Sequence, residues 1–366
     1  MEVTAPAGPL RGAVTLHLTA PPAGRAALTS IRLDGVPIET PSGPALTVRP
    51  VLTIDSARLA DREHVVTVEA EDKSRQRNRT SVSAHFVSDN TPPKLEVAGA
   101  PARLRAGQTA ALRLSTNEPA ELSASWAETP LALLNAPGTS GTASGPLARV
   151  ILVTAPVNSP AGEGALRLSG RDPAGNVTNE TVQLPIEAAA LPRQALLVPP
   201  FLAPLATGPV ATAEAAQLLA ITSPVRPERL WSGEFRTPLA AGFPRTTGFG
   251  DRRDYVDGHV AFHAGYDVAA PEGTPVLAVS GGIVAFTGPL PQRGNTVVLD
   301  HGWGVFSLYG HLSQVLVQPG QDITQGLAVG SVGNTGLSTG PHLHWEIRLR
   351  GQAIDPAQWL ALSKEL

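Results

Sequence analysis

The first half of the chain alternates apolar and polar positions with a period of two, the pattern of strands that bury one face. The clearest stretches are residues 64–72, HVVTVEAED, and residues 80–88, TSVSAHFVS. The whole chain contains 36 Gly and 35 Pro and only 16% charged residues, which favours short strands joined by tight turns over long helices. We therefore predict a mainly β protein.

A weak internal repeat indicates how these strands are grouped. Residues 68–86, VEAEDKSRQRNRTSVSAHF, resemble residues 166–186, LRLSGRDPAGNVTNETVQLPI. The repeat gives a unit of roughly 100 residues, the usual size of an immunoglobulin-like β-sandwich. Paired prolines in the stretch DNTPPKLEV stiffen the chain between the two copies. We predict two such sandwiches, over residues 1–90 and 91–188.

Residues 189–229 mix Pro, Ala and Leu and predict a linker, within which ATAEAAQLLAI predicts a short helix. The apolar stretch between Arg193 and Glu214 is interrupted by four prolines. A spanning helix there would leave backbone groups without hydrogen bonds in lipid, so we expect no transmembrane segment. No signal peptide is visible at the start, MEVTAPAGPLRGAVTLHL, which lacks a basic stretch followed by an apolar one.

The composition changes after Leu230. Six of the nine histidines lie between His259 and His344. Short apolar stretches separated by Gly, such as TPVLAVSGGIVAFTG, NTVVLDHG and GVFSLYGHL, predict a compact antiparallel sheet with tight hairpins. We predict that residues 230–366 form a separate β-domain whose chemistry depends on histidine.

Charge and cysteine content exclude several classes of function. The formal net charge of −3 provides no basic surface that could neutralise a row of phosphates, so we expect no nucleic-acid partner. The chain has no cysteine, which excludes disulfides and thiolate metal sites. Any metal must be bound by His, Asp or Glu.

Two motifs could supply such ligands. His342 and His344 are two residues apart in a stretch that predicts a strand, so their side chains share one face. His263 and Asp267 in HAGYD are also an even number apart, and Gly265 between them permits a bulge that would bring both to one ion. Either motif alone is more often structural. Together they match catalytic zinc sites, which use three ligands from His, Asp and Glu, with one histidine of the HLH pair as the third.

A further histidine, His311 in YGHLS, ends an apolar stretch. Beside a metal, an imidazole that is not a ligand can take a proton from the attacking water and return it to the leaving amine. Glu346 lies on the same strand face as His344 and could orient a ligand. The pattern therefore predicts a hydrolytic metal site.

In this order, the motifs HAGYD, YGHLS and STGPHLHWEI resemble those of the lysostaphin/LytM-type zinc metallopeptidases, and RTTGFGDRR, GNTVVLDHG and DPAQWL fit as well. The resemblance extends from roughly Leu230 to the C-terminus. It implies a small antiparallel β-fold with a groove, and hydrolysis of peptide bonds in bacterial peptidoglycan by a zinc-activated water.

The resemblance also implies residue roles. His263, Asp267 and His344 become the ligands of one zinc ion per chain. His311 and His342 become the catalytic pair beside it.

Asn295 and Tyr309 correspond to residues that line the substrate groove in relatives, and we take both as candidate groove residues. An Asn in a Gly-Asn turn and a Tyr at the end of a strand are at least as often structural. Both interpretations stay open at the level of sequence.

The leading hypothesis is a secreted or envelope-bound zinc endopeptidase that acts on peptidoglycan peptides outside the cytoplasm. A second is a non-catalytic regulator that binds and activates cell-wall amidases, but its signature is loss of ligands, and this chain retains all of them. A third is an adhesin or glycan-binding module formed by the repeats. Residues 1–188 contain Trp126 and few other aromatics, which favours a spacer or positioning role, with cell-envelope proteins as candidate partners.

Overall fold

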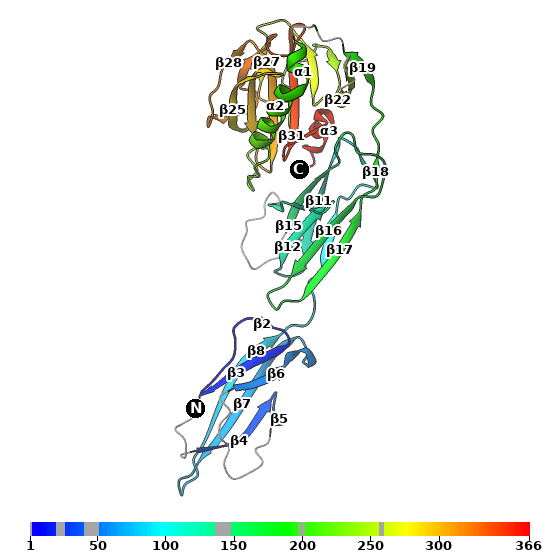
Figure 1. Ribbon diagram of the computed structural model, residues 1–366. Helices are drawn as coiled ribbons and strands as arrows, with labels where there is room; N and C mark the ends of the chain where they lie inside the picture. Colours follow the sequence, from blue (N-terminus) through cyan, green and yellow to red (C-terminus); the bar gives the residue numbers. More distant parts are fainter. Residues whose placement is uncertain are drawn as a thin grey trace.

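The chain forms an elongated molecule in which three β-rich parts follow one another (Figure 1). The computed structural model describes residues 2–19, 26–39, 51–135, 148–196, 199, 202–255 and 260–366. Strands dominate every part, which confirms a mainly β protein. Within these ranges, no helix has both the length and the apolar composition needed to cross a membrane.

The first part contains two sheets around one apolar core, in the orders β1-β3-β6 and β2-β8-β7-β4-β5. In β7 every second residue from His64 to Ala70 is buried, as the alternating pattern predicts. Leu16 from one sheet and Val66 from the other meet in this core. The strands are β1 (Glu2–Thr4), β2 (Pro9–Leu10), β3 (Ala13–Thr19), β4 (Ala26–Leu33), β5 (Val36–Glu39), β6 (Val51–Asp55), β7 (Arg62–Asp72) and β8 (Arg79–Ser88), with the short helix η1 (Ser56–Arg58).

The second part repeats this arrangement with two four-stranded antiparallel sheets, β14-β15-β11-β9 and β13-β12-β16-β17, and a parallel pair, β10-β18. Leu112, Ile151 and Leu166 from both sheets are fully buried in one core. The strands are β9 (Leu95–Ala98), β10 (Leu104–Arg105), β11 (Thr109–Thr116), β12 (Glu121–Trp126), β13 (Thr129–Leu131), β14 (Leu134–Asn135), β15 (Ala148–Thr154), β16 (Ala165–Arg171), β17 (Val177–Gln183) and β18 (Ile186–Glu187).

The third part is built on an eight-stranded sheet in the order β20-β23-β31-β27-β26-β25-β29, with β32 also paired to β31. All these pairs are antiparallel, which confirms the predicted C-terminal sheet. Smaller sheets are β24-β30-β28 and β19-β21-β22. The elements are β19 (Arg193–Leu196), α1 (Ala203–Ala206), α2 (Gly208–Thr222), β20 (Arg245–Thr247), β21 (Arg252–Tyr255), β22 (Val260–Phe262), β23 (Tyr266–Ala269), β24 (Pro275–Leu277), β25 (Gly282–Leu290), β26 (Gly294–Asp300), β27 (Val305–Leu312), β28 (Gln314–Val315), β29 (Asp322–Ile323), β30 (Ala328–Ser331), β31 (His342–Leu349), β32 (Gln352–Ile354) and α3 (Pro356–Leu362).

Strand register brings distant residues of the motifs together. In the pairing of β23 with β31, Asp267 lies opposite His344. On the other side of β31, Gly310 of β27 lies opposite the same His344. Because neighbouring strands are about 4.8 Å apart, residues far apart in sequence meet on three adjacent strands.

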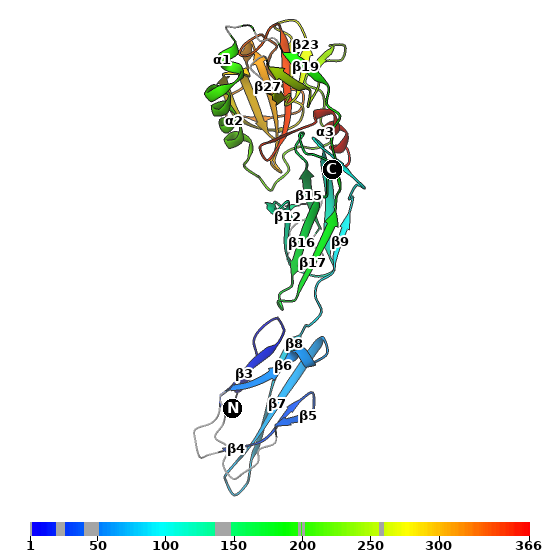
Figure 2. The ribbon, with the colours of Figure 1, turned by 45° about the vertical axis from the view of Figure 1, so that its right-hand side comes forward.

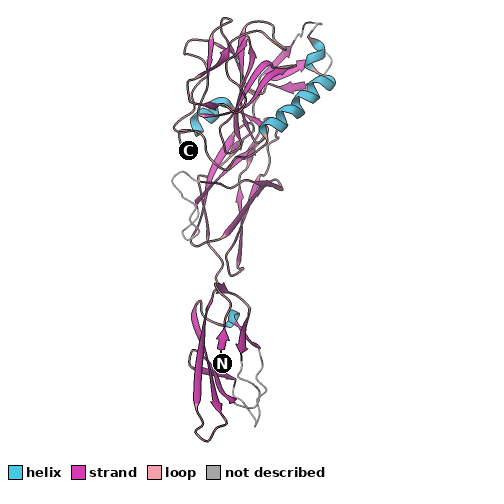
Figure 3. Cartoon of the chain, turned by 90° about the vertical axis from the view of Figure 1, so that its left-hand side faces the viewer, coloured by secondary structure: helices cyan, strands magenta, loops and turns pink. Residues whose placement is uncertain are grey.

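The segment before this sheet, in which a linker with a short helix is expected, packs along the third part. β19 pairs with β21 in parallel, and α2 lies against the sheet (Figure 2). Leu218 of α2 is buried in a cluster with Val298 and Phe306. α1, α2 and α3 all lie in the third part (Figure 3).

The second part also contacts the third. Leu152 of β15 belongs to the same apolar cluster as Trp359 of α3. Arg350 donates from Nη2 to the Leu152 carbonyl oxygen at 2.7 Å. The side chain of Gln358 exchanges hydrogen bonds with the backbone of Thr109, at 3.1 and 2.9 Å. Apolar packing and hydrogen bonds therefore join these two parts.

His301 yields a prediction about stability. Its ring is fully buried, with Nδ1 2.6 Å from the Gly281 carbonyl oxygen and Nε2 2.8 Å from Ser307 Oγ. Burial lowers the pKa of His301 from 6.5 to about 4. Between these values the unfolded chain binds a proton that the folded chain does not, so the free energy of unfolding falls as the pH falls through the window, by on the order of 3 kcal/mol.

We therefore expect His301→Gln to have a flatter dependence of unfolding free energy on pH across this window, measured by denaturant unfolding. His85→Gln, at an exposed position, is the control and should keep the wild-type slope. A His301→Gln protein with the wild-type slope would contradict the assignment.

Candidate metal centre

Three side chains converge at the junction of β23 and β31. Asp267 Oδ1 lies 3.0 Å from His263 Nε2 and 2.8 Å from His344 Nδ1, and these two nitrogens are 3.1 Å apart. All three residues are buried. Asp267 and His344 come from paired strands, and His263 comes from the segment just before β23.

Gly265 allows this approach. The chain leaves the strand geometry between β22 and β23, so His263 and Asp267 are not held at the full separation of an extended strand. A Cβ at residue 265 would lie 2.1 Å from the carbonyl oxygen of Trp345. Only glycine can therefore pass this close to β31.

The donor set fits a metal ion. The Gly248 carbonyl oxygen accepts from His263 Nδ1 at 2.8 Å, and the Glu346 carboxylate accepts from His344 Nε2 at 2.9 Å. These acceptors take the protons of the outer nitrogens, so His263 Nε2 and His344 Nδ1, which face Asp267 Oδ1, are the nitrogens that can give lone pairs to a metal ion once they are deprotonated. Two imidazole nitrogens and one carboxylate oxygen are the ligands of catalytic zinc sites.

The charges of Asp267, His263 and His344 shift one another's pKa values. Burial alone would raise the pKa of Asp267, but hydrogen bonds from His263 and His344 hold it well below its usual range. Burial lowers the pKa of His263. At His344 burial acts in the same direction, but the carboxylates of Asp267 and Glu346 outweigh it and raise the pKa. Asp267 is therefore an anion at neutral pH, as a ligand must be.

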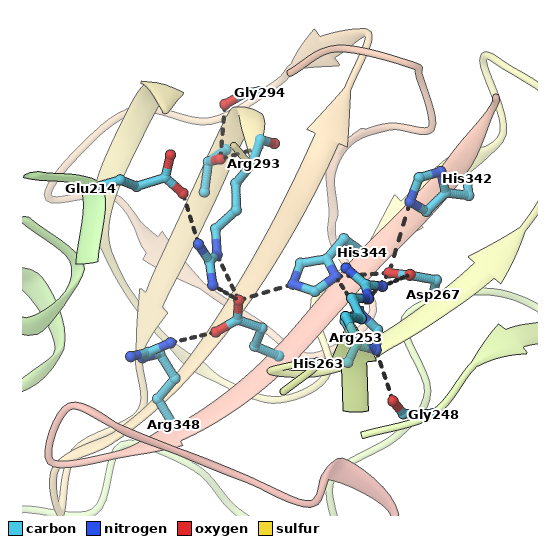
Figure 4. Close-up of polar contacts among 12 residues, drawn as sticks. Glu214, Gly248, Arg253, His263, Asp267, Arg293, Gly294, His342, His344 and Arg348 are labelled. Carbon is cyan, nitrogen blue, oxygen red and sulfur yellow. Dashed lines mark hydrogen bonds and ion pairs between the residues drawn. The ribbon is translucent and has the colours of Figure 1, made fainter. Parts of the chain in front are cut away.

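Arg253 of β21 holds the other oxygen of the same carboxylate. Its Nη2 donates to Asp267 Oδ2 at 3.0 Å (Figure 4). The guanidinium fixes the orientation of the carboxylate and leaves Oδ1 facing the two histidines. Sequence alone does not predict this contact with Asp267, because Arg253 is one of two neighbouring arginines in RTTGFGDRR.

His311 and His342 form a second pair beside this group, with ring centroids 4.5 Å apart. His311 Nδ1 donates to the Thr335 carbonyl oxygen at 2.7 Å, and His342 Nδ1 donates to the Gly340 carbonyl oxygen at 2.8 Å. Each neutral ring therefore keeps a lone pair on Nε2. His342 Nε2 lies 3.7 Å from Asp267 Oδ1, and burial lowers the pKa of His311 to about 3.

The backbone of His311 explains how this ring reaches the site. In β27, Tyr309 lies opposite Trp345, on the core face of β31. Strict alternation would put His311 on that same core face. Its φ of 60° is a left-handed conformation that non-glycine residues rarely adopt. The departure from strand geometry redirects the ring to the site, an example of strain at a chemically important position.

All five of these histidine and aspartate residues line one cleft of about 580 Å³. Its other walls include Arg253, the loop of residues 337–341, and Pro199, Ala206 and Ala211 from the segment before the sheet. A cleft of this size can hold a short stretch of peptide.

The expected groove roles of Asn295 and Tyr309 are not supported, since neither is among the described residues that line the cleft. Tyr309 is fully buried in the core, and its hydroxyl accepts a hydrogen bond from the Val279 amide at 3.0 Å. Asn295 donates from Nδ2 to the Leu312 carbonyl oxygen at 3.0 Å. Asn295 thus joins β26 to β27, and Tyr309 joins β27 to the segment between β24 and β25. His259, in the same histidine-rich region, lies outside the described residues.

Comparison with known proteins agrees with this fold and donor set. Residues 261–356 match peptidase family M23. The chain is 41% identical over 121 residues to the peptidoglycan DD-endopeptidase ShyA of Vibrio cholerae, covering 33% of this chain and 28% of that protein. It is 44% identical over 104 residues to the DD-carboxypeptidase/endopeptidase Mpg of Neisseria meningitidis, covering 28% of this chain and 24% of that protein. It thus spans about a quarter of these relatives' length.

One solved structure extends the likeness beyond the C-terminal domain. A putative M23 peptidase from Pseudomonas aeruginosa aligns with a TM-score of 0.50 and 24% identity, covering 73% of this chain and 97% of that one. This similarity concerns the fold.

The antiparallel sheet and the buried His, Asp and His group define the C-terminal part as a metallopeptidase-type domain. It is a domain of peptidase family M23.

Proposed function

We propose that the chain is a zinc-dependent endopeptidase that hydrolyses peptide bonds in bacterial peptidoglycan. The observation that carries this proposal is the convergence of three metal-binding atoms beside two imidazoles whose Nδ1 atoms are bonded to backbone carbonyls, all in one cleft. The names of the relatives ShyA and Mpg support peptidoglycan as the substrate.

In this proposal His263, Asp267 and His344 hold one zinc ion per chain. When bound there, zinc would lower the pKa of a water molecule and polarise the scissile carbonyl.

His311 and His342 handle protons. Each has its Nδ1 proton fixed on a backbone carbonyl and an Nε2 lone pair available to accept a proton from the attacking water and return it to the leaving amine. The two rings lie together as a second pair beside the three proposed zinc ligands. This arrangement supports separate roles for the two groups, proton transfer and metal binding.

The regulatory alternative, an amidase activator without activity of its own, requires a site that cannot hold metal. The ligand group of this chain is complete and its atoms lie within 4.8 Å of one another. This observation favours the enzyme.

We further propose the organisation of the chain. Residues 1–90 and 91–188 would be immunoglobulin-like sandwiches, supported by two sheets around one core in each, and residues 230–366 would be the peptidase domain. The segment 189–229 would link them, although it packs on the peptidase rather than spanning open solvent. The repeats would position the enzyme on the wall, with cell-envelope proteins as partners, in an extracytoplasmic location.

Digestion of purified peptidoglycan of known cross-link type tests the function. The zinc-loaded chain should convert cross-linked muropeptide dimers to monomers with one new amine and one new carboxylate per cut, identified by mass spectrometry. Asp322→Asn, an exposed carboxylate on β29, serves as the control and should match the wild type. Intact dimers after treatment of several wall types with zinc-loaded protein would refute the proposal.

A further inference from the structure

A buried network of charges connects helix α2 to the metal ligand His344. Glu214 of α2 accepts from Arg293 Nη1 at 2.7 Å, and Arg293 Nε donates to Glu346 Oε1 at 2.6 Å. Glu346 Oε1 in turn accepts from His344 Nε2 at 2.9 Å. Figure 4 shows Glu214, Arg293 and His344 along this line. Three contacts thus link a helix that precedes the sheet to the metal site.

The network is electrically balanced. Arg348 Nη1 donates to the second oxygen of Glu346 at 2.6 Å, so Glu346 is shared by two guanidiniums. The side chains of Glu214 and Glu346 are fully buried, and those of Arg293 and Arg348 are 14% and 12% exposed. Two carboxylates and two guanidiniums have zero formal charge. Without Glu214 the network would carry one positive charge beside a site for a divalent cation, which would oppose binding of that cation.

Glu214 also affects how firmly Glu346 holds His344. Arg293 donates hydrogen bonds to both Glu214 and Glu346. Glu346 can therefore still accept a strong hydrogen bond from His344 Nε2. Without the Glu214 carboxylate, Arg293 would bond to Glu346 alone. Glu346 would then be a weaker hydrogen-bond acceptor for His344 Nε2. A ligand histidine depends on this kind of outer contact for its tautomer and its ring orientation.

The same helical segment forms a wall of the cleft. Gln292, next to Arg293, donates from its backbone amide to Glu214 Oε2. Its side chain donates to the carbonyl oxygens of Leu205 and Ala206, at 2.9 and 3.1 Å. Ala206 and Ala211 line the cleft. The turn between β25 and β26 is therefore clamped to α1 and α2.

We propose that Glu214 is a positioning residue for the metal site, which makes α1 and α2 part of the peptidase rather than of a spacer. The segment lies outside the stretch 261–356 that matches the family. The proposal rests on the proposed function in taking zinc as the ion. It extends that function by assigning control of metal affinity to a helix in the preceding segment.

The test is the zinc dissociation constant of the full chain, measured by competition with a chromophoric chelator. Glu214→Gln should weaken zinc binding on the order of tenfold or more, and Glu346→Gln should weaken it further. The cobalt-loaded Glu214→Gln protein should also show shifted visible absorption bands, because the His344 ring is less firmly oriented. Gln217→Ala, at an exposed position of the same helix, should leave zinc affinity and spectrum unchanged.

A double-variant cycle separates positioning from a general loss of packing. If Glu214 acts through Glu346, adding Glu214→Gln to Glu346→Gln should cost less affinity than it costs in the wild type. Wild-type affinity in a folded Glu214→Gln protein, or full additivity in the double variant, would overturn the proposal. If Glu214→Gln does not fold, Glu214→Asp, which keeps the charge but withdraws it from Arg293, takes its place in the same cycle.

These measurements use no substrate, so their outcome is independent of hydrolysis. A chain that binds zinc with the expected dependence on Glu214 but leaves peptidoglycan intact would contradict only the proposed function. A wild-type chain without zinc affinity would defeat both.

Discussion

Asp267→Ala and His263→Ala proteins are expected to lose stoichiometric zinc under mild chelation and, with it, nearly all hydrolysis of peptidoglycan. Each substitution removes one of the three proposed ligands, whose donor atoms lie about 3 Å apart, and two ligands do not make a catalytic zinc site. Asp267→Ala also leaves Arg253 without its carboxylate, which places an unpaired positive charge beside the site. We therefore expect Asp267→Ala to lose at least as much zinc and activity as His263→Ala.

Metal analysis after dialysis against a weak chelator checks this expectation, with circular dichroism to establish that the variants are folded. Asp322→Asn and His85→Ala, both at exposed positions, are the matched controls. Full zinc occupancy in either ligand variant would show that the ion is held elsewhere.

His311→Ala and His342→Ala are expected to lower kcat on the order of a hundredfold or more while zinc is largely retained. These rings have their Nδ1 atoms bonded to backbone carbonyls, and we propose that they act through Nε2 on protons and charge rather than on the ion. Because the metal stays in place, the loss should appear with little change in the affinity for zinc.

The comparison with His344→Ala makes this second prediction specific. His344 and His342 differ by two positions on β31, yet only His344 contacts both Asp267 and His263 at hydrogen-bonding distance. We expect His344→Ala to lose zinc and His342→Ala to keep it. The reverse pattern would exchange the roles of the two histidines.

Sequence was sufficient for the parts of the site that depend on local geometry. Strand alternation placed His342 and His344 on one face, and the even spacing of His263 and Asp267 with Gly265 between them predicted that both could reach one ion. The structure brings these side chains together because β23 and β31 are neighbours.

Sequence was insufficient where a residue's role depends on distant contacts. Tyr309 and His311 are two positions apart, and alternation gives them the same face, but the left-handed backbone of His311 sends one ring to the cleft and leaves the other in the core. Backbone conformation of this kind has no local signal beyond the adjacent Gly310. Tyr309 itself keeps strand geometry and stays in the core.

The network that supports His344 was equally inaccessible from sequence. Arg293 is 79 residues from Glu214 and 53 from Glu346 along the chain, and the composition of residues 189–229 indicated a linker. If residues 189–229 were only a linker, a chain beginning near Arg226 would keep its zinc site and its activity. Such a truncation removes Glu214 and the buried Leu218, so we expect it to lose zinc affinity.

Anomalous X-ray diffraction at the zinc edge, from crystals of the zinc-loaded full chain, tests the central claim most directly. The account predicts one strong peak per chain, bonded to His263 Nε2, Asp267 Oδ1 and His344 Nδ1 at about 2.0 to 2.2 Å, with His311 and His342 near it but outside bonding distance. A peak at another position, or one bonded to His311 or His342 in place of His344, would contradict it.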